Sequence, residues 1–269
     1  MIKKTAGAAA AEHKSKRALH PRALLLPLLT LLLCGVYTLS LPETVSVLSG
    51  KRELPVYCVE RNDNVIAISF DAAWGGDKTI PILDILDRYN VKTTFFLVDI
   101  WTQKYPELVQ EIVSRGHEIG NHSATHAHMN QLDEAGIVKE LKGMADAAEA
   151  LTGTRPVLFR PPYGEYNDRV VSVARAQGYE VIQWSVDSLD WKNRGAEEII
   201  RRATKVQSGD IVLFHNDSQY IVDALPQVLS YYQKNGYKVV PVSGILLTGN
   251  TTIDVQGRQK PQPTTIPEV

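Results

Sequence analysis

The sequence predicts an α/β domain built on a parallel sheet. Between residues 64 and 242, short apolar runs alternate with longer stretches of amphipathic helical periodicity. Strict alternation of strands and helices favours a parallel sheet with right-handed crossovers. About seven strand-like runs in this stretch suit a small or distorted β/α barrel, and a doubly wound open sheet is the alternative.

The expected elements follow one another in strict order. The strand-like runs span residues 65–70, 93–98, 118–121, 157–160, 180–184, 211–214 and 238–242. The amphipathic stretches between them span residues 80–89, 107–115, 133–151, 168–177, 196–205 and 222–235. Gly116, Gly178 and Gly236 each close such a stretch just before the next strand, as expected of C-terminal helix caps.

An apolar segment near the N-terminus predicts a membrane anchor. Residues 23–41 form an apolar run of 19 residues, about enough for a helix to cross a ~30 Å hydrocarbon core. Residues 1–22 are basic, which places them in the cytoplasm and the rest of the chain outside. We therefore expect a single-pass protein of the cell membrane with an extracytoplasmic domain. Secretion after signal cleavage, near Thr38-Leu39-Ser40, is the alternative.

The remaining segments divide into a spacer, a domain and a tail. We expect a spacer at residues 42–62, a globular domain at residues 63–248, and a disordered tail rich in Thr, Pro and Gln at residues 249–269. A composition of 44% hydrophobic and 22% charged residues is typical of globular proteins. A net charge of −1 gives no basic footprint for nucleic acid, and two cysteines do not indicate a disulfide framework.

Polar side chains gather where the expected strands end. In a β/α barrel, the C-terminal strand ends carry the chemistry. Five of the seven expected strands are followed by such residues, namely Asp71, His122, Arg160, Asp187 with Asp190, and His215. This recurrence predicts a functional site at that face of the sheet.

Two histidines in His122-Ser-Ala-Thr-His126 are candidate metal ligands. Imidazoles four residues apart can share one face of a helical turn and bind one ion, and nitrogen ligands favour zinc. No glutamate directly follows the first histidine, so the pattern differs from that of zinc proteases. A pair of hydrogen-bonded surface histidines is the alternative.

The other candidates suit acid–base chemistry on a sugar. Asp71 could act as a base or ligand, and His215 as an acid oriented by a neighbouring carboxylate. In Arg160-Pro-Pro-Tyr163-Gly, the arginine fork can hold a carboxylate, and the Tyr163 amide can stabilise an oxyanion; a rigid loop is the alternative. Trp74 and Trp191 could face a sugar ring, whereas Trp184 lies within a strand and equally suits the core.

Taken in order, these motifs resemble the NodB-homology polysaccharide deacetylases, a carbohydrate esterase family. The matching stretches are Ser69-Phe-Asp71, His122-Ser-Ala-Thr-His126, Arg160-Pro-Pro-Tyr-Gly164, Asp187-Ser-Leu-Asp-Trp191 and Leu213-Phe-His215. The resemblance implies a distorted β/α barrel that removes acetyl groups from N-acetylated sugars with a metal ion.

The resemblance also implies a role for each matched residue. Asp71 would be the general base, positioned by Arg160, and His215 the general acid, partnered by Asp190. Tyr163 would contribute its amide to the oxyanion site. His122 and His126 would bind the metal, and Trp74, Trp191 and Leu213 would contact the substrate.

One position departs from the family pattern. The first motif of the family usually has two consecutive aspartates, the second of which binds metal, and here the second is Ala72. The stretch Phe70-Asp-Ala-Ala-Trp-Gly75 is most similar to the sporulation-type deacetylases of spore-forming bacteria, which suggests a role in sporulation.

Ala72 leaves three hypotheses open. The metal could still bind with help from Asp71, Asp77, His128 or water. The site could instead be inactive, leaving a membrane-anchored carbohydrate-binding protein, or the barrel could serve only as a scaffold in the envelope. For an anchored enzyme outside the membrane, peptidoglycan is the expected substrate, with chitin and O-acetylated xylan as alternatives.

Overall fold

The computed structural model describes residues 52–262. The expected cytoplasmic segment at residues 1–22 and the membrane segment at residues 23–41 lie outside the described residues. Within residues 52–262, no helix has the length and apolarity needed to cross a membrane.

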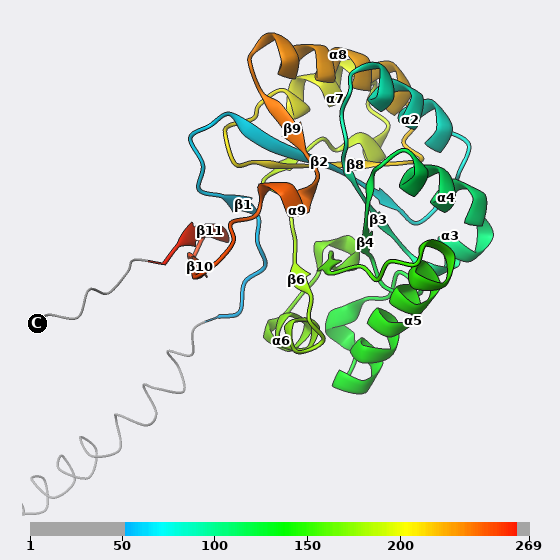
Figure 1. The fold of residues 1–269 in the computed structure, drawn as a ribbon, viewed down its shortest axis with the longest axis vertical. Helices are drawn as coiled ribbons and strands as arrows, with labels where there is room; N and C mark the ends of the chain where they lie inside the picture. Colours follow the sequence, from blue (N-terminus) through cyan, green and yellow to red (C-terminus); the bar gives the residue numbers. More distant parts are fainter. Residues whose placement is uncertain (1–51, 263–269) are drawn as a thin grey trace, which may run out of the picture. The chain divides into compact units, whose positions relative to one another are not determined.

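A curled, entirely parallel sheet forms the centre of the domain (Figure 1). Its strands run in the order β6-β5-β4-β3-β2-β8-β7, and β9 pairs with the first residues of β2. Their bounds are β2 Val65–Ala72, β3 Thr94–Leu97, β4 Glu118–Asn121, β5 Leu158–Phe159, β6 Glu180–Val181, β7 Val186–Asp187, β8 Ile211–His215 and β9 Lys238–Val240. Among the described residues no ladder joins β6 to β7, so the sheet is an open half-barrel. The predicted parallel α/β fold is confirmed.

Alternating side chains of β2 face two separate apolar layers. Ile66, Ile68 and Phe70 are fully buried against the helices. Val65 and Ala67 point to the concave side, where they pack with residues such as Val56 and Ile211. Burial on both faces explains why the strand is an almost continuous apolar run, in which Ser69 and Asp71 are the two polar residues.

The helices cover the convex face of the sheet (Figure 1). They are α2 Thr79–Arg88, α3 Asp99–Lys104, α4 Pro106–Ser114, α5 Glu134–Thr152, α6 Asp168–Ala176, α7 Ala196–Ala203 and α8 Ile221–Lys234. The single turn α9 Val242–Ile245 packs instead in the concave layer with Val65 and Ala67. The six predicted helices are present within one or two residues, whereas α3 and α9 were not predicted. Gly116, Gly178 and Gly236 have φ angles of 76°, 87° and 73°, so they close the helices as expected.

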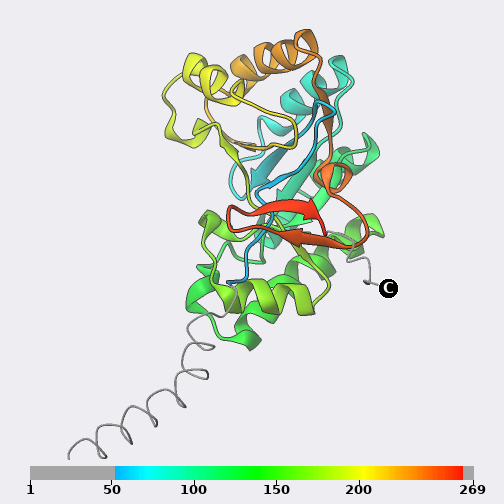
Figure 2. The ribbon, with the colours of Figure 1, turned by 90° about the vertical axis from the view of Figure 1, so that its left-hand side faces the viewer.

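The predictions of a spacer and a disordered tail were wrong in part. Three short strands, β1 Cys58–Val59, β10 Thr251–Ile253 and β11 Arg258–Pro261, form a second small sheet (Figure 2). β1 pairs in parallel with β11, and β10 pairs with β11 as a hairpin. The polar composition of the tail concealed this, because the hairpin is ordered by pairing with a strand from the other end of the domain.

Apolar contacts and one close backbone approach hold this small sheet to the barrel. Val56 and Val59 are fully buried in the inner layer, and Ile253 packs against it. The Val59 amide donates to the carbonyl of Gly209 at 2.9 Å. Gly209 has φ 91°, and a Cβ there would lie 1.8 Å from the Val59 carbonyl oxygen, so only glycine permits the contact.

Candidate active site

A cavity of about 630 Å³ opens where the parallel strands end. Asp71 and His215 enter it from the neighbouring strands β2 and β8, at paired register positions. The other predicted residues that line it are Trp74, His122, His126, Tyr163, Trp191 and Leu213. The strand ends therefore line one cavity, at the face of the sheet where the sequence predicts a functional site.

Asp71 is held from behind by a buried arginine. Arg160 Nη1 donates to Asp71 Oδ1 at 2.7 Å and to Ser69 Oγ at 2.8 Å, and Nη2 donates to the Gln183 carbonyl at 3.2 Å. Its guanidinium lies 4.1 Å from the centre of the Phe96 ring, and its side chain is fully buried. Burial opposes the charge of Asp71, but the charge and hydrogen bond of Arg160, assisted by the charge of His215, outweigh it and lower the pKa of Asp71.

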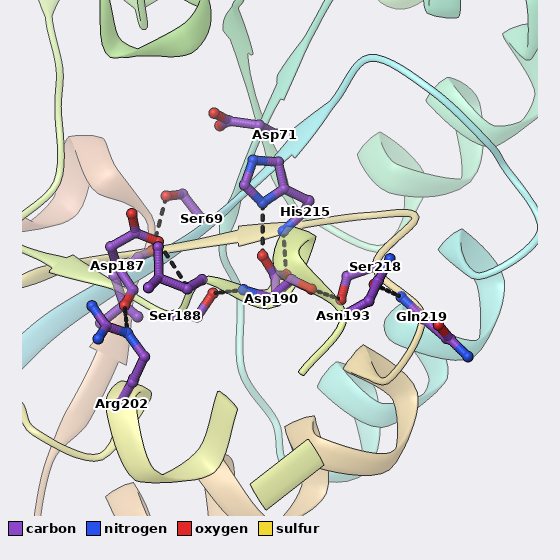
Figure 3. Close-up of polar contacts among 12 residues, drawn as sticks. Ser69, Asp71, Asp187, Ser188, Asp190, Asn193, Arg202, His215, Ser218 and Gln219 are labelled. Carbon is purple, nitrogen blue, oxygen red and sulfur yellow. Dashed lines mark hydrogen bonds and ion pairs between the residues drawn. The ribbon is translucent and has the colours of Figure 1, made fainter. Parts of the chain in front are cut away.

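His215 is oriented by a second buried carboxylate, Asp190 (Figure 3). Asp190 Oδ1 lies 2.7 Å from His215 Nδ1, and its Oδ2 accepts the His215 amide at 2.7 Å. Burial disfavours the imidazolium, but the hydrogen bond and charge of Asp190, assisted by Asp71 and Asp187, raise the pKa of His215 to about 9. His215 is therefore a proton donor at neutral pH, and the imidazole lies between Asp190 and Asp71 (Figure 3).

His122 and His126 meet, but not on a helix. β4 ends at Asn121, and the turn that follows has positive φ at Ser123 (73°) and His126 (59°), which corrects the expected helical turn. The two rings lie 5.0 Å apart. His122 Nδ1 contacts the Arg160 carbonyl at 2.7 Å, so its Nε2 faces Asp71 Oδ2 at 3.5 Å. Burial lowers the pKa of both imidazoles, that of His126 to about 4, so both are neutral and able to act as ligands.

These donors do not complete a metal site. Ala72 is fully buried in the apolar layer with Val98 and Trp101, and the next residue, Ala73, lines the cavity instead. Over residues 52–262, no group of three or more His, Cys, Asp or Glu side chains could hold a metal ion. The buried Nδ1 of His126 has no hydrogen-bond partner, so one ligand position is available. Two imidazoles fit a zinc ion, but catalytic zinc normally has three protein ligands.

Two of the suggested replacement ligands, His128 and Asp77, have other partners. His128 Nδ1 contacts Glu165 Oε2 at 2.8 Å, and its ring stacks on Tyr163 at 4.4 Å. The Asp77 side chain is 76% exposed, lies 3.6 Å from Lys78 Nζ and does not line the cavity. Neither side chain therefore takes the place of the absent aspartate.

Tyr163 occupies a strained turn at the cavity wall. Its φ is 59°, and its ring packs against His126 at 4.3 Å. Gly164 follows with φ 69°, where a Cβ would lie 2.8 Å from Trp184. The Pro161-Pro162 turn thus fixes this backbone next to the histidines, although a role of the Tyr163 amide stays a prediction.

Aromatic side chains line the cavity rim. Trp74 and Trp191 are 58% and 54% exposed, whereas Leu213 is buried at the floor. Trp184, which equally suited the core from sequence, also lines the cavity and lies 5.7 Å from the Arg160 guanidinium. Solvent-exposed indoles at a cavity mouth are suited to stacking on a sugar ring.

Three polar residues that the sequence motifs did not predict also line the cavity. Asp217 and Ser218 follow His215 closely, and Asn193 follows Trp191. Ser218 Oγ donates to the Asp190 carbonyl at 3.0 Å and so supports the turn that carries the acid's partner. Their closeness to predicted site residues was the signal that could have found them.

Comparison with known proteins finds deacetylases as relatives. The sequence pattern of the family described as polysaccharide deacetylase matches residues 59–182. A peptidoglycan-N-acetylglucosamine deacetylase of Bacillus cereus is 37% identical over 194 residues, 70% of this chain and 91% of the relative. The peptidoglycan-N-acetylmuramic acid deacetylase PdaC of Bacillus subtilis is 35% identical over 187 residues, 69% of this chain but only 39% of PdaC.

A solved structure of an inactive relative is also similar. A CE4 family pseudoenzyme from Bacillus anthracis has a TM-score of 0.69 and 31% identity, covering 72% of this chain and 69% of that one. A mutant of that pseudoenzyme, described as having restored enzymatic activity, has the same TM-score and 33% identity, covering 72% and 71% of the two chains. Sequence pattern, identity and fold agree, and the chain belongs to the polysaccharide deacetylase family.

Proposed function

We propose that this protein hydrolyses the acetamide groups of N-acetylated sugars in cell-wall polysaccharide, with peptidoglycan as the substrate, and releases acetate. One observation carries the proposal: the buried pair Arg160–Asp71 and the partly buried pair Asp190–His215 direct a base and an acid into the same cavity. Burying charged pairs costs desolvation free energy that apolar residues would avoid. Since binding alone needs neither an acid nor a base, their retention supports catalysis.

The charge states suit amide hydrolysis at neutral pH. Asp71, with its lowered pKa, is ionised and can accept a proton from a water molecule that attacks the acetyl carbonyl. His215 is protonated and can donate its proton to the departing amine, while Asp190 holds its Nδ1. The Tyr163 amide is proposed to hold the oxyanion. Water and acetamide thereby yield acetate and a free amine.

Zinc is the metal that two imidazole ligands favour, but this mechanism includes no metal step. Among residues 52–262, no third side chain joins His122 and His126 as a metal ligand, and Ala72 cannot ligate an ion. We therefore expect weak zinc binding and slow turnover, because the oxyanion lacks the Lewis acid that three-ligand zinc sites supply.

A second function is a carbohydrate-binding protein with an inactive site. Ala72, packed in the apolar layer, favours it, as does the likeness to a CE4 family pseudoenzyme. The exposed Trp74 and Trp191 would serve binding equally well. In both cases residues 23–41 are proposed to anchor the domain outside the membrane. A role in sporulation is also proposed, because Phe70–Gly75 resembles the first motif of the sporulation-type deacetylases.

Acetate release decides between the two functions. The full chain, purified in mild detergent, would be incubated with peptidoglycan, chitin oligomers and acetylated xylan, with zinc content measured in parallel. We expect acetate from peptidoglycan that the Asp71→Asn and His215→Gln variants abolish and that Asp77→Asn, an exposed control, preserves. Glycan binding without acetate from any substrate would establish the second function instead.

A further inference from the structure

The cavity carries more negative charge than its two ion pairs balance. Arg160 lies 2.7 Å from Asp71, and Asp190 lies 2.7 Å from His215, so each pair is internally compensated. Two more carboxylates, Asp187 and Asp217, also line the cavity. They are the excess charge that a ligand meets.

Neither excess carboxylate forms a salt bridge with a cationic side chain among the described residues. Asp187 Oδ1 accepts the Leu189 amide at 2.8 Å, while Arg202 Nε donates to the backbone carbonyl of Asp187 at 2.7 Å (Figure 3). Lys78 Nζ similarly donates to the backbone carbonyl of Asp217, at 3.2 Å. Within residues 52–262 no salt bridge includes the carboxylate of Asp187 or Asp217.

Apart from His215, whose charge Asp190 balances, the described side chains of the cavity offer an anion no cationic partner. No lysine or arginine is among its described lining residues. The wall consists of indole rings, imidazoles and neutral polar groups such as Asn193 and Ser218. A neutral sugar can stack and hydrogen bond here, whereas an anionic group meets uncompensated carboxylates in a cleft that focuses their field.

We propose that Asp187 and Asp217 make this cavity selective for N-acetylglucosamine over sugars with a free carboxylate such as N-acetylmuramic acid. This inference rests on the proposed function, because it assumes that the acetamide enters between Asp71 and His215. The lactyl ether of muramic acid is attached to the carbon next to the one that bears the acetamide. A muramic acid residue whose acetamide enters the site therefore brings its carboxylate close to the cavity lining.

The size of the effect follows from Coulomb's law. Two like charges roughly 7 Å apart in a partly hydrated cleft repel enough to weaken binding about tenfold for each excess carboxylate. Because solvent reaches the cavity, added salt reduces this penalty.

Three matched ligands separate charge from size. They are the benzyl glycosides of N-acetylglucosamine, of N-acetylmuramic acid, and of N-acetylmuramic acid with its lactyl carboxylate converted to the amide. Their affinities for the full chain in mild detergent would be measured by tryptophan fluorescence in EDTA, so that no divalent cation masks the carboxylates. Trp74 and Trp191 at the cavity supply the signal.

We expect the free acid to bind at least tenfold more weakly than its amide. Asp187→Asn and Asp217→Asn should each reduce that ratio severalfold, and 0.5 M salt should reduce it too. Asp77→Asn, which removes an exposed charge outside the cavity lining, should leave the ratio unchanged. Equal binding of acid and amide, no binding of any ligand, or an unchanged ratio in both cavity variants would overturn the inference.

Acetate release from the same three glycosides distinguishes the two proposals. Selective binding without acetate would refute the deacetylase function and leave the selectivity intact. Acetate released equally fast from the acid and the amide would support the enzyme and overturn the selectivity.

Discussion

His215 Nδ1 lies 2.7 Å from Asp190 Oδ1, and the same carboxylate accepts the backbone amide of His215 at 2.7 Å. Asp190 thus holds the imidazole in position and stabilises its protonated form. Because Asp190 is fully buried, its charge acts on His215 with little screening by solvent.

The Asp190→Asn variant should move the alkaline limit of activity. In the native chain, kcat/KM for acetate release should be flat at neutral pH and fall as His215 loses its proton near pH 9. Without the carboxylate, burial dominates and the pKa of His215 should fall to about 6.5 or below. The pH profile and the titration of the His215 imidazole by NMR measure this shift, with Asp77→Asn as control. An unmoved alkaline limb would contradict the assignment of His215 as the acid.

The Arg160→Met variant should lose stability in a pH-dependent manner. Removing Arg160 leaves the Asp71 carboxylate buried without a partner, which costs about 3–5 kcal/mol in the free energy of unfolding. The lowered pKa of Asp71 means that its pair stabilises the fold above the ordinary carboxyl pKa and that this contribution fades as the pH falls. In the variant, burial without Arg160 raises the pKa of Asp71, so the carboxyl takes up a proton at acidic pH. Urea unfolding should therefore show a larger loss at pH 8 than at pH 4. Arg201→Met, which breaks an exposed pair with Glu198, should cost no more than about 1 kcal/mol at either pH.

The Ala72→Asp variant should gain zinc affinity. A carboxylate at the fully buried Ala72 costs about 2–3 kcal/mol of stability when no metal is present. If it turns toward His122 and His126, zinc at about a hundred times its Kd restores about 2.7 kcal/mol. Melting temperature with EDTA and with zinc, together with acetate release, measures the gain. Ala72→Asn is the matched control, since it has the same shape without the charge; equal effects of zinc on both variants would argue against this geometry.

Two glycines with positive φ should differ in their response to alanine. Gly153 caps α5 with φ 70°, and a Cβ added there would meet no atom within 4 Å, so Gly153→Ala should cost only about 1 kcal/mol. Gly209→Ala adds a clash with the Val59 carbonyl and should cost several times as much, because β1 must move away. Thermal unfolding of both variants measures the difference. Similar costs would mean that the contact between Gly209 and Val59 is not needed for stability.

The features that could be predicted from the sequence are those that depend on the local pattern of apolar and polar residues. Asp71 and His215 interrupt apolar runs at their ends, and parallel strands bring such ends together, so the site followed from the order of elements. The small sheet of β1, β10 and β11 could not be predicted, because its pairing joins residues near both ends of the domain. The turn between His122 and His126 was also missed: its positive φ angles are set by contacts such as the Ser123 amide donating to Asn121 Oδ1 at 2.8 Å.

The pairing of Cys58 with Arg258 joins strands that are nearly the whole domain apart in sequence. Contacts of such high sequence separation form late, because a long loop must close before they stabilise anything. During synthesis, the inner apolar layer around Val56 and Val59 stays incomplete until Ile253 of β10, which packs against it, has left the ribosome. This small sheet thus delays completion of the domain until almost all of it has been made, an interval in which a chaperone can bind the unfinished chain.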